Sequence, residues 1–172
     1  MTANGAEPGL VIQTQVNPAL SGTSFTLDDG ASFTFSFFNV WTNEPKIETD
    51  DLVASPISAT LNFDSPLTGT AVNGITVGGS WYKGLSQWGQ LTWNGPVTIS
   101  LPGDRTFQIT LSDATFNYGL GGTQEGLAGC ATVEATVKQI SSPVPDGGRT
   151  ALLLGTALSV LGIAARVRGR TA

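Results

Sequence analysis

The sequence contains no histidine, a single cysteine and few charged side chains. Without histidine the chain cannot form a Ser-His-Asp triad, a Cys-His dyad or a histidine-ligated zinc or haem site. One cysteine cannot close a disulfide within the chain or build a cysteine cluster. Charged residues make up 12% of the 172, against roughly a quarter in an ordinary soluble domain. The length suits one domain with a sizeable core, and we expect a protein that is not an enzyme.

Positive charge is scarce in most of the chain and concentrated at the C-terminus. Residues 1–144 hold 12 acidic side chains and four basic ones, whereas residues 145–172 hold one acid and four arginines. Such a change indicates a boundary between an acidic body and a short basic tail. The acidic body also argues against a nucleic acid partner, because the phosphate backbone is negative.

An uncharged run rich in leucine, alanine and glycine occupies residues 150–165. As a helix it would span about 24 Å, which is short for the roughly 30 Å of a bilayer core unless the arginine that follows reaches back to the interface. We predict a transmembrane helix over 150–167 and a basic cytoplasmic tail over 168–172, which places the body on the far side of the membrane. The alternative is a buried C-terminal helix of a soluble domain. The orienting residues are Arg166, Arg168 and Arg170.

A linker over residues 141–149, bounded by prolines, precedes the apolar run. Linker, apolar run and terminal arginine cluster together closely resemble the C-terminal sorting signals of the PEP-CTERM group, in the variant that begins Val-Pro-Asp. The resemblance implies an exported protein of a Gram-negative bacterium, held transiently in the inner membrane and processed by an exosortase. Its destination would be the cell surface or an extracellular exopolysaccharide matrix such as a biofilm. The motif consists of Val144, Pro145, Asp146, Gly147 and Gly148.

Export implies a signal peptide with a basic start and an apolar stretch, and residues 1–8 have neither feature. We expect residues 1–8 to be disordered, with the small side chains of Ala3, Gly5 and Ala6 as the remnant of a cleavage site. The alternative is insertion of the chain through its tail, which would leave the body in the cytoplasm.

Apolar and polar residues alternate with a period of two along the body, and no stretch of it shows a convincing helical period. We predict an all-β domain over residues 9–140, an antiparallel β-sandwich of jelly-roll-like or immunoglobulin-like type, followed by one C-terminal hydrophobic helix. The best hairpin joins residues 97–101 to 107–111, and the glycine-rich residues 119–129 predict a long mobile loop. Turns are expected at residues 28–30, 73–74, 94–96 and 102–104.

A second resemblance lies in the body. Residues 41–47 read Trp-Thr-Asn-Glu-Pro-Lys-Ile and stand between two alternating runs. The segment is similar to the motif of an ectodomain family called choice-of-anchor K, or the THxN group, although the histidine is missing and Lys46 is inserted. The family precedes exosortase-type tails and has no established activity. The resemblance therefore implies an exported β-domain and adds no chemistry.

Two acidic clusters lie near the first core strands. Extracellular β-domains often bind Ca²⁺ through carboxylate and carbonyl oxygens of their loops, so these clusters form a candidate calcium site. The alternative is that aspartate makes turns and that acids keep the surface soluble. A glycosidase would need two of these carboxylates about 5–10 Å apart, which spacing in the sequence cannot show. The candidates are Asp28, Asp29, Glu48, Asp50 and Asp51.

Four aromatic residues, Trp81, Tyr82, Trp88 and Trp93, crowd into 13 positions. Flat aromatic faces stack on sugar rings, so the segment is a candidate site for exopolysaccharide. The alternative is core packing or cross-strand aromatic pairing. Adjacent residues on a strand point to opposite faces, so we expect one of Trp81 and Tyr82 to be exposed.

Cys130 opens the last alternating run, on its polar face or at the strand edge. We expect a lone structural thiol, with an intermolecular disulfide in an oxidising exterior as the alternative.

Three hypotheses follow from the sequence. The first is an exported surface or matrix protein with a structural or adhesive role and no resident cofactor. The second is a carbohydrate-binding module. The third is a self-assembling subunit, because edge strands and low charge invite strand addition.

Overall fold

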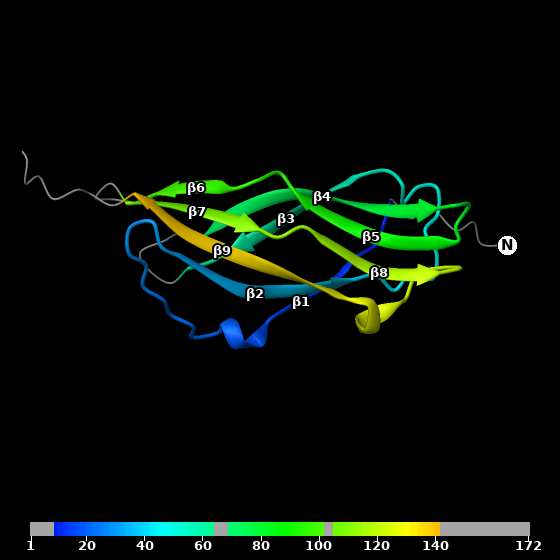
Figure 1. Cartoon of the computed structure of the whole chain (residues 1–172), viewed down its shortest axis with the longest axis horizontal. Helices are drawn as coiled ribbons and strands as arrows, with labels where there is room; N and C mark the ends of the chain where they lie inside the picture. Colours follow the sequence, from blue (N-terminus) through cyan, green and yellow to red (C-terminus); the bar gives the residue numbers. More distant parts are fainter. Residues whose placement is uncertain (1–8, 64–68, 102–104, 142–172) are drawn as a thin grey trace, which may run out of the picture. The chain divides into compact units, whose positions relative to one another are not determined.

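The computed structural model describes residues 9–63, 69–101 and 105–141 (Figure 1). Within these residues, the strands form one five-stranded sheet with the order β1-β2-β9-β7-β6 and one four-stranded sheet with the order β3-β4-β5-β8. Two short 3-10 helices, η1 (Pro18–Leu20) and η2 (Gly126–Gly129), lie in the connections. The strands are β1 (Gln13–Val16), β2 (Ser32–Trp41), β3 (Ser55–Leu61), β4 (Thr70–Trp81), β5 (Ser86–Trp93), β6 (Val97–Ser100), β7 (Thr106–Leu111), β8 (Ala114–Leu120) and β9 (Ala131–Ser141).

Several sequence predictions lie outside the described residues. They are the disordered N-terminus 1–8, the turn at 102–104, the linker beyond Ser141, the sorting motif Val144–Gly148, the span 150–167, and Arg166, Arg168 and Arg170.

Every strand pair in the two sheets is antiparallel, and the sheets form a half-barrel. This confirms the predicted all-β, antiparallel class. The predicted hairpin is also confirmed, because β6 pairs with β7 in a register that sets Val97 opposite Ile109 and Ser100 opposite Thr106. Strict alternation of apolar and polar side chains produced this register, since one face of each strand is buried.

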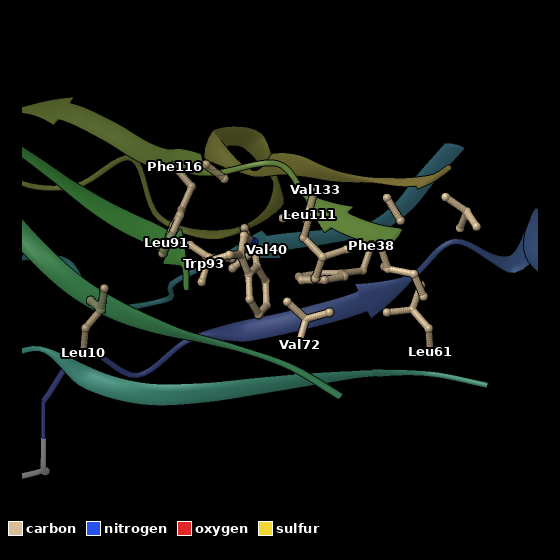
Figure 2. Close-up of a cluster of buried hydrophobic side chains, with 14 of the residues drawn as sticks. Leu10, Phe38, Val40, Leu61, Val72, Leu91, Trp93, Leu111, Phe116 and Val133 are labelled. Carbon is tan, nitrogen blue, oxygen red and sulfur yellow. The ribbon is translucent and has the colours of Figure 1, made fainter. Parts of the chain in front are cut away.

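One apolar core receives side chains from both sheets (Figure 2). Val40 and Val133 enter it from the five-stranded sheet, and Val72 and Leu91 enter it from the four-stranded sheet. All four are fully buried. Burying one such side chain contributes about 1.5–3 kcal/mol, so the alternating runs that supply them are the main source of stability.

The turn expected at Asn73 and Gly74 is wrong. Both residues lie inside β4, where Gly74 is buried and pairs with Trp93 of β5. A Cβ on Gly74 would lie 2.5 Å from the carbonyl oxygen of Thr92 and 2.8 Å from the Trp93 ring. The glycine therefore permits close packing of two strands around a tryptophan, which an Asn-Gly pair in the sequence does not distinguish from a turn.

The mobile loop predicted over residues 119–129 is wrong in part. Its first two residues end β8, and η2 closes its last turn. Backbone hydrogen bonds tie the remainder to the body: Gly121 donates to the carbonyl of Leu85 at 2.8 Å, and Gly126 donates to that of Thr42 at 2.9 Å. Glycine here supplies positive φ and close approach rather than a free loop.

Strand β9 runs along the body from one end to the other. It begins beside η2, where Ala131 pairs with Val40, and ends at Ser141 beyond Ser32 of β2 (Figure 1). Its 11 residues span about 36 Å at roughly 3.3 Å per residue. The β4–β5 turn and the end of β8 lie at the η2 end, because Gly121 bonds to Leu85 and Gly126 to Thr42. Ser141, the last residue of β9, lies at the opposite end of the body.

Candidate functional site

The outer face of the four-stranded sheet carries no charged side chain on its described strands. Alternate residues of each strand turn away from the core, and the register of the three strand pairs aligns them into rows. The rows combine hydroxyl, amide, aliphatic and aromatic groups. They are Pro56, Ser58 and Thr60 of β3; Ala71, Asn73, Ile75, Val77, Gly79 and Trp81 of β4; Ser86, Trp88, Gln90 and Thr92 of β5; and Thr115, Tyr118 and Leu120 of β8.

Trp88 lies flat on this face because its cross-strand partner is Gly79. A Cβ on Gly79 would come within 2.3 Å of the Trp88 indole. Any side chain at this position would lift the ring from the sheet. On its other side, Trp88 stacks with Tyr118, with ring centroids 6.0 Å apart and planes inclined by 26°. The Tyr118 hydroxyl donates to the Ser86 hydroxyl oxygen at 3.1 Å, which holds the phenol ring across β5.

A β-bulge in β8 gives Tyr118 its direction. Three residues of β5, from Gln87 to Gly89, face four of β8, from Gly119 back to Phe116. The extra residue, Asn117, has φ +53 and is fully buried. Because one inserted residue shifts all later side chains to the other face, Tyr118 points outward instead of following Phe116 into the core. The pattern of the sequence does not predict an exposed Tyr118 for this reason, and the asparagine within the alternating run is the available signal.

Trp81 and Tyr82 are both exposed, at 62% and 73%, so the expectation that only one of them would be exposed is wrong. Strand β4 ends at Trp81, and the chain then turns through Tyr82, Lys83 and Gly84 at φ +46, +57 and +87. The alternation of a strand no longer applies there, and the two rings meet with centroids 5.7 Å apart. Two consecutive non-glycine residues in the left-handed region store about 1–2 kcal/mol each.

Trp93 does not belong to the surface. It is 7% exposed, its ring meets Phe38 edge-on at 6.4 Å, and its indole nitrogen donates to the Ser112 carbonyl at 3.1 Å. The suggestion that it stacks on sugar is therefore wrong, and the core-packing alternative holds for this residue. The surface aromatic residues form what we call the aromatic strip: Trp81, Tyr82, Trp88 and Tyr118.

Asn117 also joins the strip to the segment 41–47. Its Oδ1 accepts from the backbone N–H of Thr42 at 2.8 Å, and its Nδ2 donates to the carbonyls of Gln124 and, at 3.0 Å, Gly126. Thr42 is fully buried, and its hydroxyl donates to the Val11 carbonyl at 2.7 Å. Thr42 therefore connects strand β8 to the segment before β1 through hydrogen bonds. It has no side-chain group exposed for binding, although it belongs to the segment that resembles the THxN motif.

The structure does not bring the two acidic clusters together. Asp28 and Asp29 lie in the confirmed turn before β2, where Ala31 donates to the Asp28 carbonyl at 3.0 Å. The cluster that includes Asp50 follows the other end of β2, about 30 Å away by the length of a ten-residue strand. Among the described residues, no group of three or more acidic, cysteine or histidine side chains is placed to hold a metal ion.

Within the second cluster, Asp51 caps a turn. Its carboxylate accepts from the backbone N–H of Glu48 at 2.7 Å, and its carbonyl accepts from Gly78 of β4 at 2.7 Å. Desolvation of the buried carboxylate raises its pKa above the ordinary value, and the nearby charge of Asp50 adds to this, while the hydrogen bond from Glu48 acts in the opposite direction. The residue positions the loop against β4.

We expect Asp51→Asn to become more stable relative to the parent as the pH rises. Since the folded-state pKa of Asp51 lies above its unfolded value, its favourable contribution is complete below about pH 4 and is lost as the pH rises through the folded-state pKa. Asparagine keeps the acceptor oxygen and does not ionise. Urea unfolding of both proteins between pH 3 and 7 measures this, and a constant difference in unfolding free energy across that range would contradict it.

Cys130 is a half-buried free thiol directly before β9. Its backbone N–H closes η2 by donating to the Leu127 carbonyl at 3.2 Å. Cys130 therefore lies next to the first residue of β9, at the end of the strand.

Comparison of the chain with protein-family models, with curated proteins and with solved structures finds no match. In the part of the chain that the structure describes, none of the helices is long and apolar enough to span a bilayer.

Proposed function

We propose that the body is an adhesive module that binds polysaccharide through the aromatic strip. The observation that carries the proposal is the set of rings on one sheet face, with Tyr118 at 57% and Trp81 at 62% exposed and Trp88 lying flat over Gly79 and stacked with Tyr118. Exposed apolar rings beside polar groups mark binding surfaces. Sugar rings offer C–H faces to such rings and hydroxyls to the amide and hydroxyl groups beside them.

Affinity electrophoresis through polysaccharide-containing gels tests this function. We expect Trp81→Ala and Tyr118→Ala each to weaken binding about tenfold, because each removes one stacking ring. Ile140→Ala, which truncates an exposed apolar side chain on β9 of the other sheet, is the matched control and leaves binding unchanged. Equal retention of all four proteins would refute the proposal.

We also propose that the protein is exported and sorted through its C-terminal segment, with an exosortase and the inner membrane as transient partners and the cell surface or matrix as its destination. The support is the resemblance of the tail to PEP-CTERM signals, carried by Val144–Gly148 and the arginines that follow. The proposed role is structural or adhesive rather than enzymatic.

Intact mass of the protein in membrane and secreted fractions of its native host tests the sorting proposal. We expect a secreted species that ends between Val144 and Gly148. A full-length species that stays in the inner membrane would mean that the tail is a plain anchor.

We propose the two-layer β-sandwich as the finer description of the fold, since both sheets close on one core. Self-assembly through sheet edges is less favoured as a function. Three of the four described edge strands are short or contain proline: β1 and β6 have four residues each and β3 contains Pro56, whereas the fourth edge strand, β8, has seven residues. Short edges and proline both oppose strand addition.

A further inference from the structure

We infer that the polysaccharide recognised by the aromatic strip is a neutral glycan, contacted along its chain. This inference rests on the proposed binding function and specifies the ligand. It would exclude polyuronates, sulfated glycans and amino-sugar polymers as preferred ligands.

The distribution of charge over the two sheets carries the argument. The outward rows of β3, β4, β5 and β8 contain no charged residue, whereas the outer face of the other sheet exposes Glu134 and Lys138 of β9. The low charge content of the whole chain therefore does not by itself explain the uncharged face, because the other sheet does expose charged residues. A face that bound carboxylates or sulfates would need arginine or lysine among the rings, and one that bound ammonium groups would need carboxylates.

The surroundings of the strip lead to the same ligand. Lys83, in the β4–β5 turn, is the one cation contributed by the described residues of β4, β5, β8 and that turn. Residues 1–144 hold 12 acids against four bases, so the field of the body repels polyanions at a distance. Lys83 in the turn and the exposed Lys46, whose loop packs beside Gly122 after β8, do not offset this field.

The polar groups next to the rings suit sugar hydroxyls. Gln90 and Thr92 continue the row of Trp88 on β5, and Thr115 precedes Tyr118 on β8. Amides and hydroxyls both donate and accept, as sugar hydroxyls do, without a charge to desolvate. The rings lie on an open sheet face, where a chain can pass over them from end to end. We therefore assign the interior of a glycan chain, rather than its terminus, as the contact.

Retention of the full-length chain by three polymers tests the inference: a neutral β-glucan, alginate as polyuronate and chitosan as polyamine. We expect at least about tenfold stronger retention by the glucan, unchanged between about 0.01 M and 1 M salt, since no ion pairs form. Stronger retention by alginate or chitosan that Trp81→Ala and Tyr118→Ala abolish would overturn the inference while leaving polysaccharide binding intact. No retention by any polymer would overturn the binding function as well.

A charge placed within the strip provides an independent check. Gln90→Lys adds a cation beside Trp88 and is expected to create salt-sensitive retention on alginate that the parent lacks. Gln15→Lys makes the same change on the exposed edge strand β1 of the other sheet and is expected to create none. Equal gains in the two variants would show that alginate senses net charge alone, and the assignment of the contact face would be wrong.

Discussion

Replacing Asn117 with alanine is expected to lower the free energy of unfolding by about 3–5 kcal/mol. The change strands the buried N–H of Thr42 and two loop carbonyls, those of Gln124 and Gly126. Alanine must also adopt φ +53, which costs it about 1–2 kcal/mol. The bulge that turns Tyr118 outward is lost with these bonds, so polysaccharide binding falls too. Equilibrium unfolding in urea measures the stability.

One variant separates the loss of hydrogen bonds from the cost of positive φ, and a second serves as a control. Asn117→Gly removes the same hydrogen bonds and tolerates positive φ, so it is expected to lose about 1 kcal/mol less than Asn117→Ala. Asn43→Ala alters an exposed asparagine in the neighbouring segment and stays within about 0.5 kcal/mol of the parent. If Asn117→Ala were as stable as the parent, the hydrogen bonds of the Asn117 side chain would not be what holds the bulge.

Trp93→Ala is expected to destabilise the protein by about 3–5 kcal/mol, whereas Trp81→Ala changes stability by no more than about 0.5 kcal/mol. Trp93 fills the core against Phe38 and donates to Ser112, so its removal leaves a cavity and an unpaired carbonyl. Trp81 is largely in solvent. Urea unfolding of the two variants gives the comparison directly.

Trp93→Phe is the control for cavity formation. Phenylalanine keeps most of the apolar volume and loses the hydrogen bond to Ser112, so a loss of about 1–2 kcal/mol is expected. Equal destabilisation by Trp81→Ala and Trp93→Ala would contradict the division of the tryptophans into surface and core.

Alternation in the sequence was sufficient to predict some of the strands that form the core, such as β9, but it did not predict β4, where a turn was expected, nor β5 and β8. In β9, Val133, Ala135 and Val137 are buried while Thr132 and Glu134 are exposed, as a period of two requires. The sequence contains no comparable pattern that shows which strands pair with each other. The pairing of β2 with β9 and of β5 with β8 joins segments far apart in sequence, and alternation specifies the face of a strand but not its neighbour.

The candidate site was predicted only in part, and each error has a local cause. Trp81, Tyr82 and Trp88 were identified because aromatic residues are conspicuous, but their exposure depended on a left-handed turn and on Gly79. Tyr118 was missed because the bulge at Asn117 reverses the alternation. Buried hydrogen bonds fix that bulge, and their partners lie in segments that sequence spacing does not bring together.

The measurement that tests the account most directly is the affinity of the full-length chain for exopolysaccharide purified from its own host. The parent is compared with Trp81→Ala/Tyr118→Ala, after urea unfolding has shown equal stability, and with Ile140→Ala. We predict that the double variant binds about 100-fold more weakly, because the two rings act on separate parts of the glycan, and that Ile140→Ala binds as the parent does. A folded double variant with parental affinity would contradict the aromatic strip as the functional site of this protein.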